Sequence, residues 1–432
     1  MSDPSAAKTR AARPSLRNYV LVTGAYWADT VTDGATRMLV LFYFYNLGYT
    51  PLAVASLFIF YEVFGILTNL FGGYIGARFG LKTTLFIGLG TQLVALSMLA
   101  FAPQGWIVVA YVMVSQALSG IAKDMTKMSS KSAVKLIVPE DASATLYRWV
   151  AILTGSKNAL KGVGFFLGGL LLTLFDFQTA LKFLVVLVGA TLILAAMLMR
   201  GGLGQANKKA KFAQMFSRNG AVNKLAAARI FLFGARDVWF VVGLPVFLSS
   251  VLGWTFWQTG GFLAVWVIGY GIVQAATPGL LRSRVEEHHE PDGRTATMLA
   301  FALAALPAGI ALGLSAGMAP GTVVVAGLIT FGVAFALNSA VHSYLILAYT
   351  DSDKVAMNVG FYYMANATGR LAGTVLSGAL YQWGVQSGPN NGLVACLWAS
   401  SAFVLVAGLL SLLLPRNVGP RSKPIKLDDL GD

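Results

Sequence analysis

Long apolar stretches recur along the whole of this chain, and they leave few choices of fold. A helix needs about 20 apolar residues to cross roughly 30 Å of hydrocarbon. Twelve stretches of this chain are long enough. Hydrophobic residues make up 56% of the 432 positions and charged residues only 12%, whereas an ordinary soluble domain carries about 25% charged residues. The sequence therefore predicts an all-α integral membrane protein with twelve transmembrane helices.

Basic loops predict how the chain sits in the bilayer. The predicted spans are 18–46, 52–77, 83–102, 105–128, 144–175, 179–200, 223–252, 256–281, 296–317, 320–349, 354–384 and 390–415. Lysine and arginine gather in both tails and in every second loop, and such loops stay in the cytoplasm. Both termini are therefore expected on the cytoplasmic side of the membrane, with residues 1–17 as a cytosolic tail that lacks signal-peptide features. The net charge of +14 fits this topology, so we do not expect nucleic-acid binding.

Two halves of six spans each resemble one another on either side of a polar segment. The predicted bundles are residues 18–200 and 223–415, joined by a cytoplasmic linker at 201–222 and flanked by tails at 1–17 and 416–432. Short matches recur in the same order: LGYT (47–50) with LGWT (252–255), SAVK (132–135) with SAVH (339–342), and Lys161 with Arg370. This pattern predicts two parallel pseudo-repeats, as in the major facilitator fold, whose substrate site lies near the midplane between the halves.

The loop after the second span resembles the major facilitator loop signature. GGYIGARFGLK (72–82) has its glycines and bases, but Ala77 stands where the family has an acid. In the family that acid helps to latch the halves at the cytoplasmic side. The usual latch is therefore expected to be weakened or replaced.

Basic side chains inside the apolar segments are the main functional signal. An ionisable group at the centre of a bilayer costs about 2.5–3.5 kcal/mol on insertion scales, so such groups usually mark a substrate or ion pathway. The set is mostly positive, which predicts an anionic cargo. The candidate substrate-binding residues are Arg37, Lys157, Lys161, Arg236 and Arg370.

Acidic side chains accompany these cations. Asp29, Asp33 and Arg37 follow i, i+4, i+8 and share one helical face. They form either a buried ion pair that orders the bundle, or a site where Arg37 binds an anion while an aspartate balances charge or carries a proton. Asp237 and Glu62 are candidates for the same charge balance or proton coupling.

The seventh span contains AARIFLFGARDVWF, with Arg229, Arg236 and Asp237. Arg236 and Asp237 are neighbours and are expected to point in different directions, so that Asp237 does not simply neutralise Arg236. Arg229 lies near the cytoplasmic end, where it is expected to snorkel or to serve cytoplasmic access.

Lysine recurs at every fourth position at the end of the fourth span, at Lys123, Lys127, Lys131 and Lys135. This is either a solvated helix end under the positive-inside rule or an electropositive ramp that draws an anion from the cytosol. Lys123 and Lys127 are the candidates for such access, and Asp124 is expected to pair with Lys127 at i+3.

Two further features concern packing. Gly164 and Gly168 follow the lysines of the fifth span at small-xxx-small spacing, which predicts a close helix contact. His342 is a lone histidine in the tenth span. It is expected to be a hydrogen-bonded structural group rather than a proton switch.

Catalytic and cofactor motifs are not found in the sequence. Cys396 is the single cysteine, no metal-ligand cluster is present, and no dinucleotide or P-loop fingerprint follows a strand. No arrangement of nucleophile, base and acid is evident. We therefore expect a protein that is not an enzyme, uses no metal or cofactor, and draws energy from a gradient or from the concentration difference of its substrate.

Three long strings resemble the bacterial organoarsenical efflux permeases of the major facilitator superfamily. They are LSGIAKDMTKMSSKSAVKLIVPEDASATLYRWVAILTGSKNALKGVGFFLGG (118–169), ARIFLFGARDVWFVVGLPVFLSSVLGW (228–254) and FLAVWVIGYGIVQ (262–274). The resemblance implies export of 1-arseno-3-phosphoglycerate, the unstable product formed when glyceraldehyde-3-phosphate dehydrogenase uses arsenate in place of phosphate. It also implies that this dehydrogenase is the functional partner. Outside the cell the product breaks down to arsenate and 3-phosphoglycerate, so the pair gives arsenate resistance.

The sequence leaves other functions open. An organophosphate or inorganic-anion antiporter of the same fold would use the same basic residues. A non-transporting membrane sensor would need an extended signalling domain, for which we expect the tail after Pro415 to be too short. A lipid translocator would need an apolar lateral path.

Overall fold

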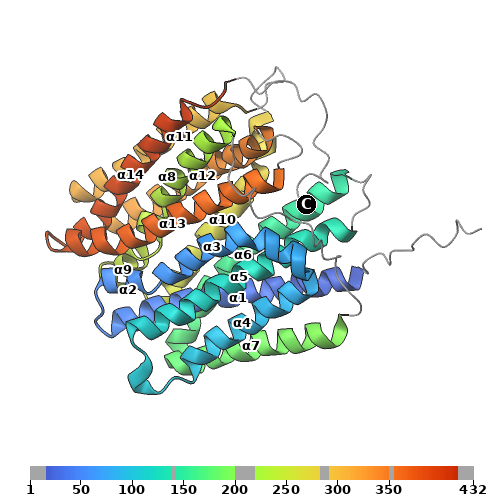
Figure 1. Ribbon diagram of the computed structural model, residues 1–432. Coiled ribbons are helices and arrows are strands. Elements are labelled where there is room, and N and C mark those ends of the chain that lie inside the picture. The colour runs from blue at the N-terminus through green and yellow to red at the C-terminus, as the bar shows by residue number, and fades with distance from the viewer. Residues whose placement is uncertain (1–15, 138–142, 200–218, 283–290, 350–354, 417–432) are drawn as a thin grey trace, which may run out of the picture.

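The computed structural model describes residues 16–137, 143–199, 219–282, 291–349 and 355–416 as a bundle of long helices (Figure 1). The N-terminal half contains α1 (Leu16–Asn46), α2 (Pro51–Ser56), α3 (Ile59–Phe79), α4 (Leu81–Ala100), α5 (Val109–Ile137), α6 (Ser143–Leu174) and α7 (Phe177–Leu198). The C-terminal half contains α8 (Gly220–Phe240), α9 (Gly243–Ser250), α10 (Phe256–Arg282), α11 (Gly293–Ser315), α12 (Pro320–Ala348), α13 (Val355–Val385) and α14 (Asn391–Ser411). A 3₁₀ turn, Gln104–Trp106, precedes α5. The twelve predicted spans fall on these helices, so the all-α fold is confirmed.

Polarity divides the membrane-crossing segments into two groups. Within the described residues, eight of them are long and apolar enough to cross a membrane by length and composition. The other four are α1, α5, α6 and α13, and they carry most of the charges that the sequence singled out, the exceptions being Glu62 on α3 and Arg229, Arg236 and Asp237 on α8. The same four helices line the central cavity described below. Their polarity therefore reflects a shared interior face.

Two spans are interrupted where the sequence predicted continuous helices. The second span breaks between α2 and α3, and the seventh breaks between α8 and α9 at Val241–Val242. A broken helix leaves backbone N–H groups without partners, which is costly in a membrane. At the second break the Ser377 hydroxyl of α13 accepts hydrogen bonds from the N–H groups of Val242 and Gly243, at 3.2 and 3.0 Å. Hydrophobicity alone does not reveal such a break, because the interrupted residues are as apolar as their neighbours.

The two halves meet through three pairs of helices. Across the boundary α6 packs along α10, and α13 packs along α2 and α3. Figure 1 shows the yellow-to-red helices of the C-terminal half stacked on the blue-to-green helices of the N-terminal half. Helix α1 begins and α14 ends on the same side of the molecule, as an even number of crossings requires (Figure 1).

Glycine permits the close contact of α1 with α6. A Cβ placed on Gly164 would overlap the carbonyl oxygen of Val31, and one on Gly168 would overlap that of Ala35. A Cβ on Gly34 would come within 2.8 Å of the Lys161 carbonyl oxygen. The predicted packing role of the glycine pair is confirmed, and it brings Lys161 of α6 next to Asp33 of α1.

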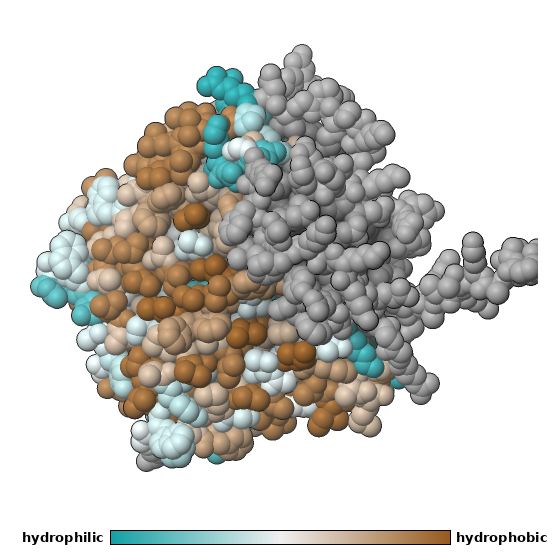
Figure 2. All heavy atoms as spheres, in the orientation of Figure 1, coloured by the Kyte–Doolittle hydropathy of each residue, from teal (hydrophilic) through white to brown (hydrophobic). Residues whose placement is uncertain are grey.

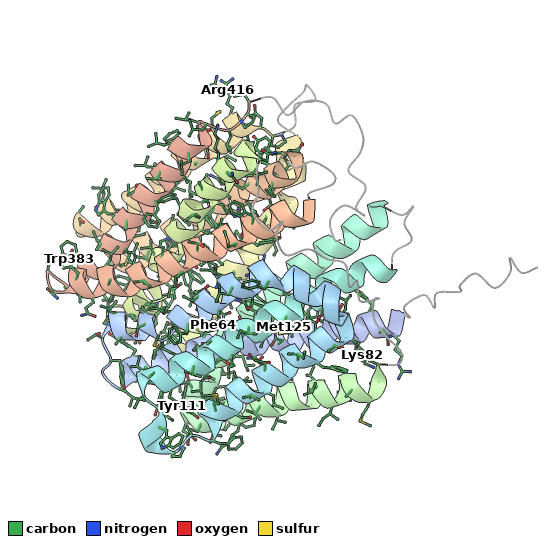
Figure 3. The ribbon with its side chains drawn as sticks, in the orientation of Figure 1. Phe64, Lys82, Tyr111, Met125, Trp383 and Arg416 are labelled. Atoms are coloured by element: carbon green, nitrogen blue, oxygen red, sulfur yellow. The ribbon has the colours of Figure 1, made fainter. Side chains whose placement is uncertain are left out.

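The outer surface is apolar around the middle of the bundle. Figure 2 shows a broad field of hydrophobic residues on the visible face, with paler and hydrophilic residues at its rims. Large apolar side chains point outward from the bundle, among them Val186, Met197 and Val265, which are 68–74% exposed. Figure 3 places Lys82 and Arg416 towards one end of the helices and Tyr111 and Trp383 towards the other. Such an apolar belt between polar ends fits immersion in a bilayer.

Candidate substrate site

A cavity between the two halves is lined by eight charged side chains. It has about 740 Å³ of empty volume, part of it open solvent, and about 90 Å³ in which the centre of a water molecule fits. Helices α1, α3, α5 and α6 of one half and α13 of the other surround it. The lining residues are Tyr26, Thr30, Asp33, Glu62, Gly65, Asn69, Lys123, Asp124, Lys127, Lys157, Lys161, Tyr363, Asn366, Ala367 and Arg370.

The lining of this cavity is net positive. Five of its side chains are cationic and three are acidic. The five include three of the predicted substrate-binding residues, Lys157, Lys161 and Arg370, and both lysines proposed for cytoplasmic access. Charges in such a cleft focus the field and attract a ligand of opposite sign. An anion is therefore the chemistry that this lining favours.

Glu62 joins the two halves at the cavity wall. Its Oε1 accepts a hydrogen bond from Arg370 Nη2 of α13 at 2.7 Å and lies 3.4 Å from Arg37 Nη1 of α1. The carboxylate is 1% exposed. Arg370 also lies near a second acid, with its Nε 3.5 Å from Asp237 Oδ2. The sequence placed Glu62 among the charge-balancing candidates but gave no sign that it spans the boundary.

The aspartates of α1 have partners other than Arg37. Lys161 Nζ lies 3.8 Å from Asp33 Oδ2, and the hydroxyl of Tyr61 donates to Asp33 Oδ1 at 2.6 Å. Asp29 accepts a hydrogen bond from the Thr126 hydroxyl at 2.6 Å. The i, i+4 spacing thus puts these groups on one face without pairing Arg37 with either aspartate.

Helix α5 presents its lysines to the cavity through a local network. Lys127 forms the predicted i, i+3 ion pair with Asp124 at 2.5 Å and donates to Asn69 Oδ1 at 2.6 Å. Lys123 Nζ lies 4.1 Å from the centroid of the Tyr61 ring, in cation–π range. The pairing of Asp124 with Lys127 is confirmed. Lys131 and Lys135, the rest of the predicted ramp, have side chains outside the described part of the structure.

Arg236 departs from its sequence prediction. Its Nε donates to Asp237 Oδ1 at 2.6 Å, and its Nη2 also pairs with that oxygen. The expectation that neighbouring residues would point apart is wrong here, because a long guanidinium side chain can turn back to the adjacent carboxylate. Arg236 also lies over the Phe233 and Phe335 rings, 5.1 and 5.7 Å from their centroids.

Arg37 and Arg236 are thus placed one layer away from the cavity. Neither is among the residues that line it. Each touches an acid that also contacts Arg370: Glu62 in the case of Arg37, and Asp237 in the case of Arg236. The predicted basic set therefore divides into three residues at the cavity and two that hold the acids next to Arg370.

Arg229 does not snorkel as the sequence predicted. It is 4% exposed, and its Nη1 donates to the Ser339 carbonyl oxygen at 3.3 Å. His342, expected to be hydrogen-bonded, is fully buried with neither ring nitrogen bonded to any described residue. Both differences arise from helix contacts in the C-terminal half, which a single sequence does not specify.

Several residues that line the cavity could not be recognised as site residues from the sequence. Tyr363, Ala367, Gly65 and Thr30 are uncharged and occur in ordinary apolar stretches. Helical spacing offers one clue, because Tyr363 and Arg370 are seven residues apart and share a face of α13. Among the described residues no group of three or more histidine, cysteine, aspartate or glutamate side chains is positioned to hold a metal ion.

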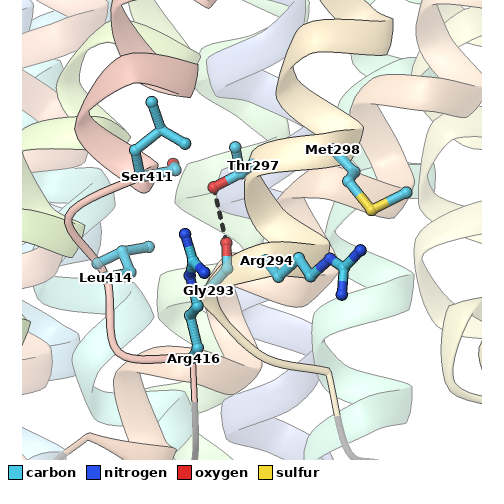
Figure 4. A pocket seen from close by; sticks show the side chains of 8 residues that line it. Gly293, Arg294, Thr297, Met298, Ser411, Leu414 and Arg416 are labelled. Carbon is cyan, nitrogen blue, oxygen red and sulfur yellow. Dashed lines mark hydrogen bonds between the residues drawn. The ribbon is translucent and has the colours of Figure 1, made fainter.

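A second, smaller hollow lies at the end of α11 and α14 (Figure 4). It has about 60 Å³ in which the centre of a water molecule fits, and Arg294 and Arg416 flank it. In Figure 4 the Thr297 hydroxyl is turned towards the Gly293 carbonyl, to which it donates at 2.8 Å. Because this hollow sits at the helix ends, away from the ion pairs that join the halves, it is not the candidate substrate site.

Comparison with known proteins identifies the family. The sequence model of the Major Facilitator Superfamily matches residues 22–349. The chain belongs to this superfamily, and it is a membrane transporter, not an enzyme. No curated protein sequence matches it.

Solved transporter structures share the fold at low sequence identity. A mutant of the nucleoside transporter NupG has a TM-score of 0.70 and 13% identity, covering 91% of this chain and 99% of its own. A POT family transporter in complex with a thioalcohol-conjugated peptide has a TM-score of 0.73 and 12% identity, with coverages of 92% and 95%. A D-xylose–proton symporter has a TM-score of 0.67 and 12% identity, with coverages of 92% and 98%. These likenesses show the fold.

Proposed function

We propose that this protein is a secondary active exporter of 1-arseno-3-phosphoglycerate and confers arsenate resistance together with glyceraldehyde-3-phosphate dehydrogenase. The family match supports a transporter that carries a small solute across a lipid bilayer. The resemblance of the three long strings to organoarsenical permeases supplies the identity of the cargo. The proposed location is the bacterial inner membrane, with both termini in the cytoplasm.

One observation carries the proposal: cations of both halves converge on a single cavity. Lys157 and Lys161 come from α6, and Arg370 comes from α13. The proposed cargo has an arsenate group at one end and a phosphate at the other, so it needs positive charge at both ends. Arginine offers a planar fork for such oxyanions, and lysine offers a compact point charge.

The acids of the site have a separate role in this proposal. In the structure Glu62 and Asp237 hold Arg370, while Asp33 lies beside Lys161. An arriving oxyanion competes with these carboxylates for the same cations. We assign to Asp29, Asp33, Glu62 and Asp237 the balance of charge in the empty site, and to Arg37 and Arg236 the positioning of Glu62 and Asp237.

Alternating access follows from the division into halves. The proposed moving bodies are residues 18–200 and 223–415, linked by 201–222 and flanked by tails at 1–17 and 416–432. Helices α6 with α10, and α13 with α2 and α3, form their contacts. Since Glu62 and Arg370 lie on opposite sides of this boundary, cargo that displaces Glu62 weakens a contact between the halves. Binding and movement are coupled in this way.

The experiment is arsenic retention in an arsenate-sensitive bacterial strain. The strain expresses this chain alone, the dehydrogenase alone, both, or the dehydrogenase with the Lys161→Gln variant. We expect lower retention when both intact proteins are present, and retention at the level of the dehydrogenase alone with Lys161→Gln. Equal retention in all strains, with the chain shown to be folded in the membrane, would refute the proposed cargo.

An organophosphate or inorganic-anion antiporter is the second candidate, because the same net positive cavity suits those anions. An exchanger requires a counter-anion on the opposite side of the membrane. Efflux from vesicles that depends on external phosphate would favour this candidate. A non-transporting sensor is a third alternative, and the match to a transporter family argues against it.

A further inference from the structure

A buried arginine in the C-terminal half has no acidic partner. Arg229 of α8 is 4% exposed, and it forms no ion pair with any carboxylate in the described residues. Its Nη1 donates a hydrogen bond to the Ser339 carbonyl oxygen. Nε is buried without a partner. A buried charge without compensation is strongly unfavourable, so this arginine requires a reason to be there.

Two aromatic rings fix the orientation of this guanidinium. Its central carbon lies 3.8 Å from the centroid of the Phe233 ring and 4.9 Å from that of Tyr362. Rings that cover the flat surface of a guanidinium stabilise its charge and leave its N–H edge for hydrogen bonds. That edge is the part that binds a carboxylate or a phosphate in the bidentate manner.

Unsatisfied polar side chains occur on α12, the helix whose backbone accepts the hydrogen bond from Arg229. On α12, Asn338 and His342 are one turn apart and share a face, and both are 0% exposed. The amide nitrogen and oxygen of Asn338 and both ring nitrogens of His342 have no hydrogen-bond partner among the described residues. Ser339, between them in sequence, is the residue whose carbonyl holds Arg229. Buried polar groups are normally satisfied, so several unpartnered atoms on the helix that holds this cation indicate a ligand that bonds to them together.

One face of α13 connects this cluster with the central cavity. Tyr362, Asn366 and Arg370 follow i, i+4, i+8 and lie on the same side of the helix. Asn366 and Arg370 line the cavity, while Tyr362 stacks on Arg229. Eight residues of helix span about 12 Å. The cluster thus lies about 12 Å from Arg370 along α13.

We propose that Arg229, Asn338 and His342 form a second oxyanion site, distinct from the central cavity. The site takes one phosphate-like or arsenate-like group: Arg229 supplies charge and a planar fork, and the Asn338 amide and a His342 ring N–H supply further donors. It serves as a staging position for the cargo between the central cavity and the Gly220 end of α8, which is the predicted cytoplasmic end. The class of ligand rests on the proposed function, whereas the existence of the site rests on the cluster alone.

Binding of inorganic phosphate tests the site directly. The full-length protein is purified into lipid nanodiscs, and binding of radiolabelled phosphate is measured by equilibrium dialysis at constant ionic strength. Arg370→Gln is present throughout to weaken binding in the central cavity. Into this background we introduce Asn338→Leu and His342→Phe. The control is Thr374→Val, which removes a buried unpartnered hydroxyl about three turns of α13 beyond Tyr362.

We expect Arg370→Gln to retain a phosphate site, and Asn338→Leu and His342→Phe each to weaken its affinity at least tenfold, with Thr374→Val unchanged. Replacing orphan groups by apolar ones of similar shape leaves folding intact or improves it, so these variants stay measurable where Arg229→Gln fails to fold. Affinities within twofold of the Arg370→Gln parent, or no phosphate binding by that parent, would overturn the proposal. If the arsenic-retention test fails while this pattern is found, the second site stands and only the proposed cargo falls.

Discussion

Glu62 is the residue on which the contact between the halves depends most directly. Its carboxylate is almost completely buried, and a single oxygen meets Arg370 at 2.7 Å and Arg37 at 3.4 Å. A buried acid of this kind is stable only while its cations are in place. Arg370 is therefore at once a partner of Glu62 and a candidate ligand for the cargo, and the two roles compete.

Removal of either partner is expected to destabilise the protein. Arg370→Met leaves Glu62 with Arg37 alone, and truncation of one member of a buried charge pair costs about 2–5 kcal/mol. The double variant Glu62→Gln, Arg370→Met removes both charges and is expected to lose less stability than the sum of the single variants. Thermal unfolding in nanodiscs measures this double-mutant cycle.

The exposed Arg294→Gln is the control, with an expected change within about 0.5 kcal/mol. Additive losses would show that the two residues do not interact.

At the scale of helices, close packing decides where the charges meet. Helix α6 approaches α1 through Gly164 and Gly168, and this contact brings Lys161 to Asp33. Around a glycine in such a contact there is no room for a side chain, so the helices separate if one is added.

Substitution of Gly164 is expected to break this contact. In Gly164→Ala the new Cβ meets the Val31 backbone, which cannot move without shifting α1. We expect a loss of about 1–3 kcal/mol, seen as a lower melting temperature in detergent. Gly24→Ala is the matched control, because nothing lies within 4 Å of a Cβ at that position of α1. Equal stability of the two variants would contradict the packing role.

The N-terminal cap of helix α7 lies outside the predicted transmembrane span, and its strength depends on pH. The exposed Asp176 carboxylate accepts a hydrogen bond from the Thr179 backbone N–H at 3.0 Å and caps the helix. Hydrogen bonds from Thr179 lower the pKa of Asp176. The stabilisation is therefore present above the unfolded-state pKa, about 3.9, and is lost as the pH falls through the lower folded-state pKa.

Loss of this cap is expected to loosen the first turn of α7. Asp176→Ala removes about 1 kcal/mol of capping, which corresponds to roughly fivefold faster hydrogen exchange at the Thr179 amide. Asp176→Asn is the control, because asparagine caps as well as aspartate but does not titrate. Exchange that is unchanged in Asp176→Ala at neutral pH would show that the cap is not needed.

The sequence was sufficient to predict the helices but not to predict which side chains contact each other across helices. Apolar length located all twelve spans, and the i, i+3 rule found the pair of Asp124 with Lys127. Partners across helices depend on which faces meet, so the bridge from Glu62 to Arg370, the burial of Arg229 and the turn of Arg236 onto Asp237 could not be foreseen. For the same reason the sequence found three of the five basic candidates at the cavity and did not distinguish them from the other two.

At the scale of the whole molecule, the halves share one charged cavity at their boundary. Its lining comes from four helices of one half and one of the other, and its net charge is positive. A transporter of this family works by opening that boundary to each side in turn. An anion that replaces Glu62 on Arg370 therefore acts on the contact that must open.

The most direct measurement is uptake of radioactive arsenic into everted membrane vesicles that contain this protein. The external medium holds arsenate, glyceraldehyde-3-phosphate, NAD and the dehydrogenase, so that the cargo forms at the vesicle surface. We predict accumulation that requires all four components and this protein, and that falls at least tenfold in the Lys161→Gln variant. Accumulation from arsenate alone, or none with the complete mixture and a folded protein, would contradict export of the arsenylated phosphoglycerate.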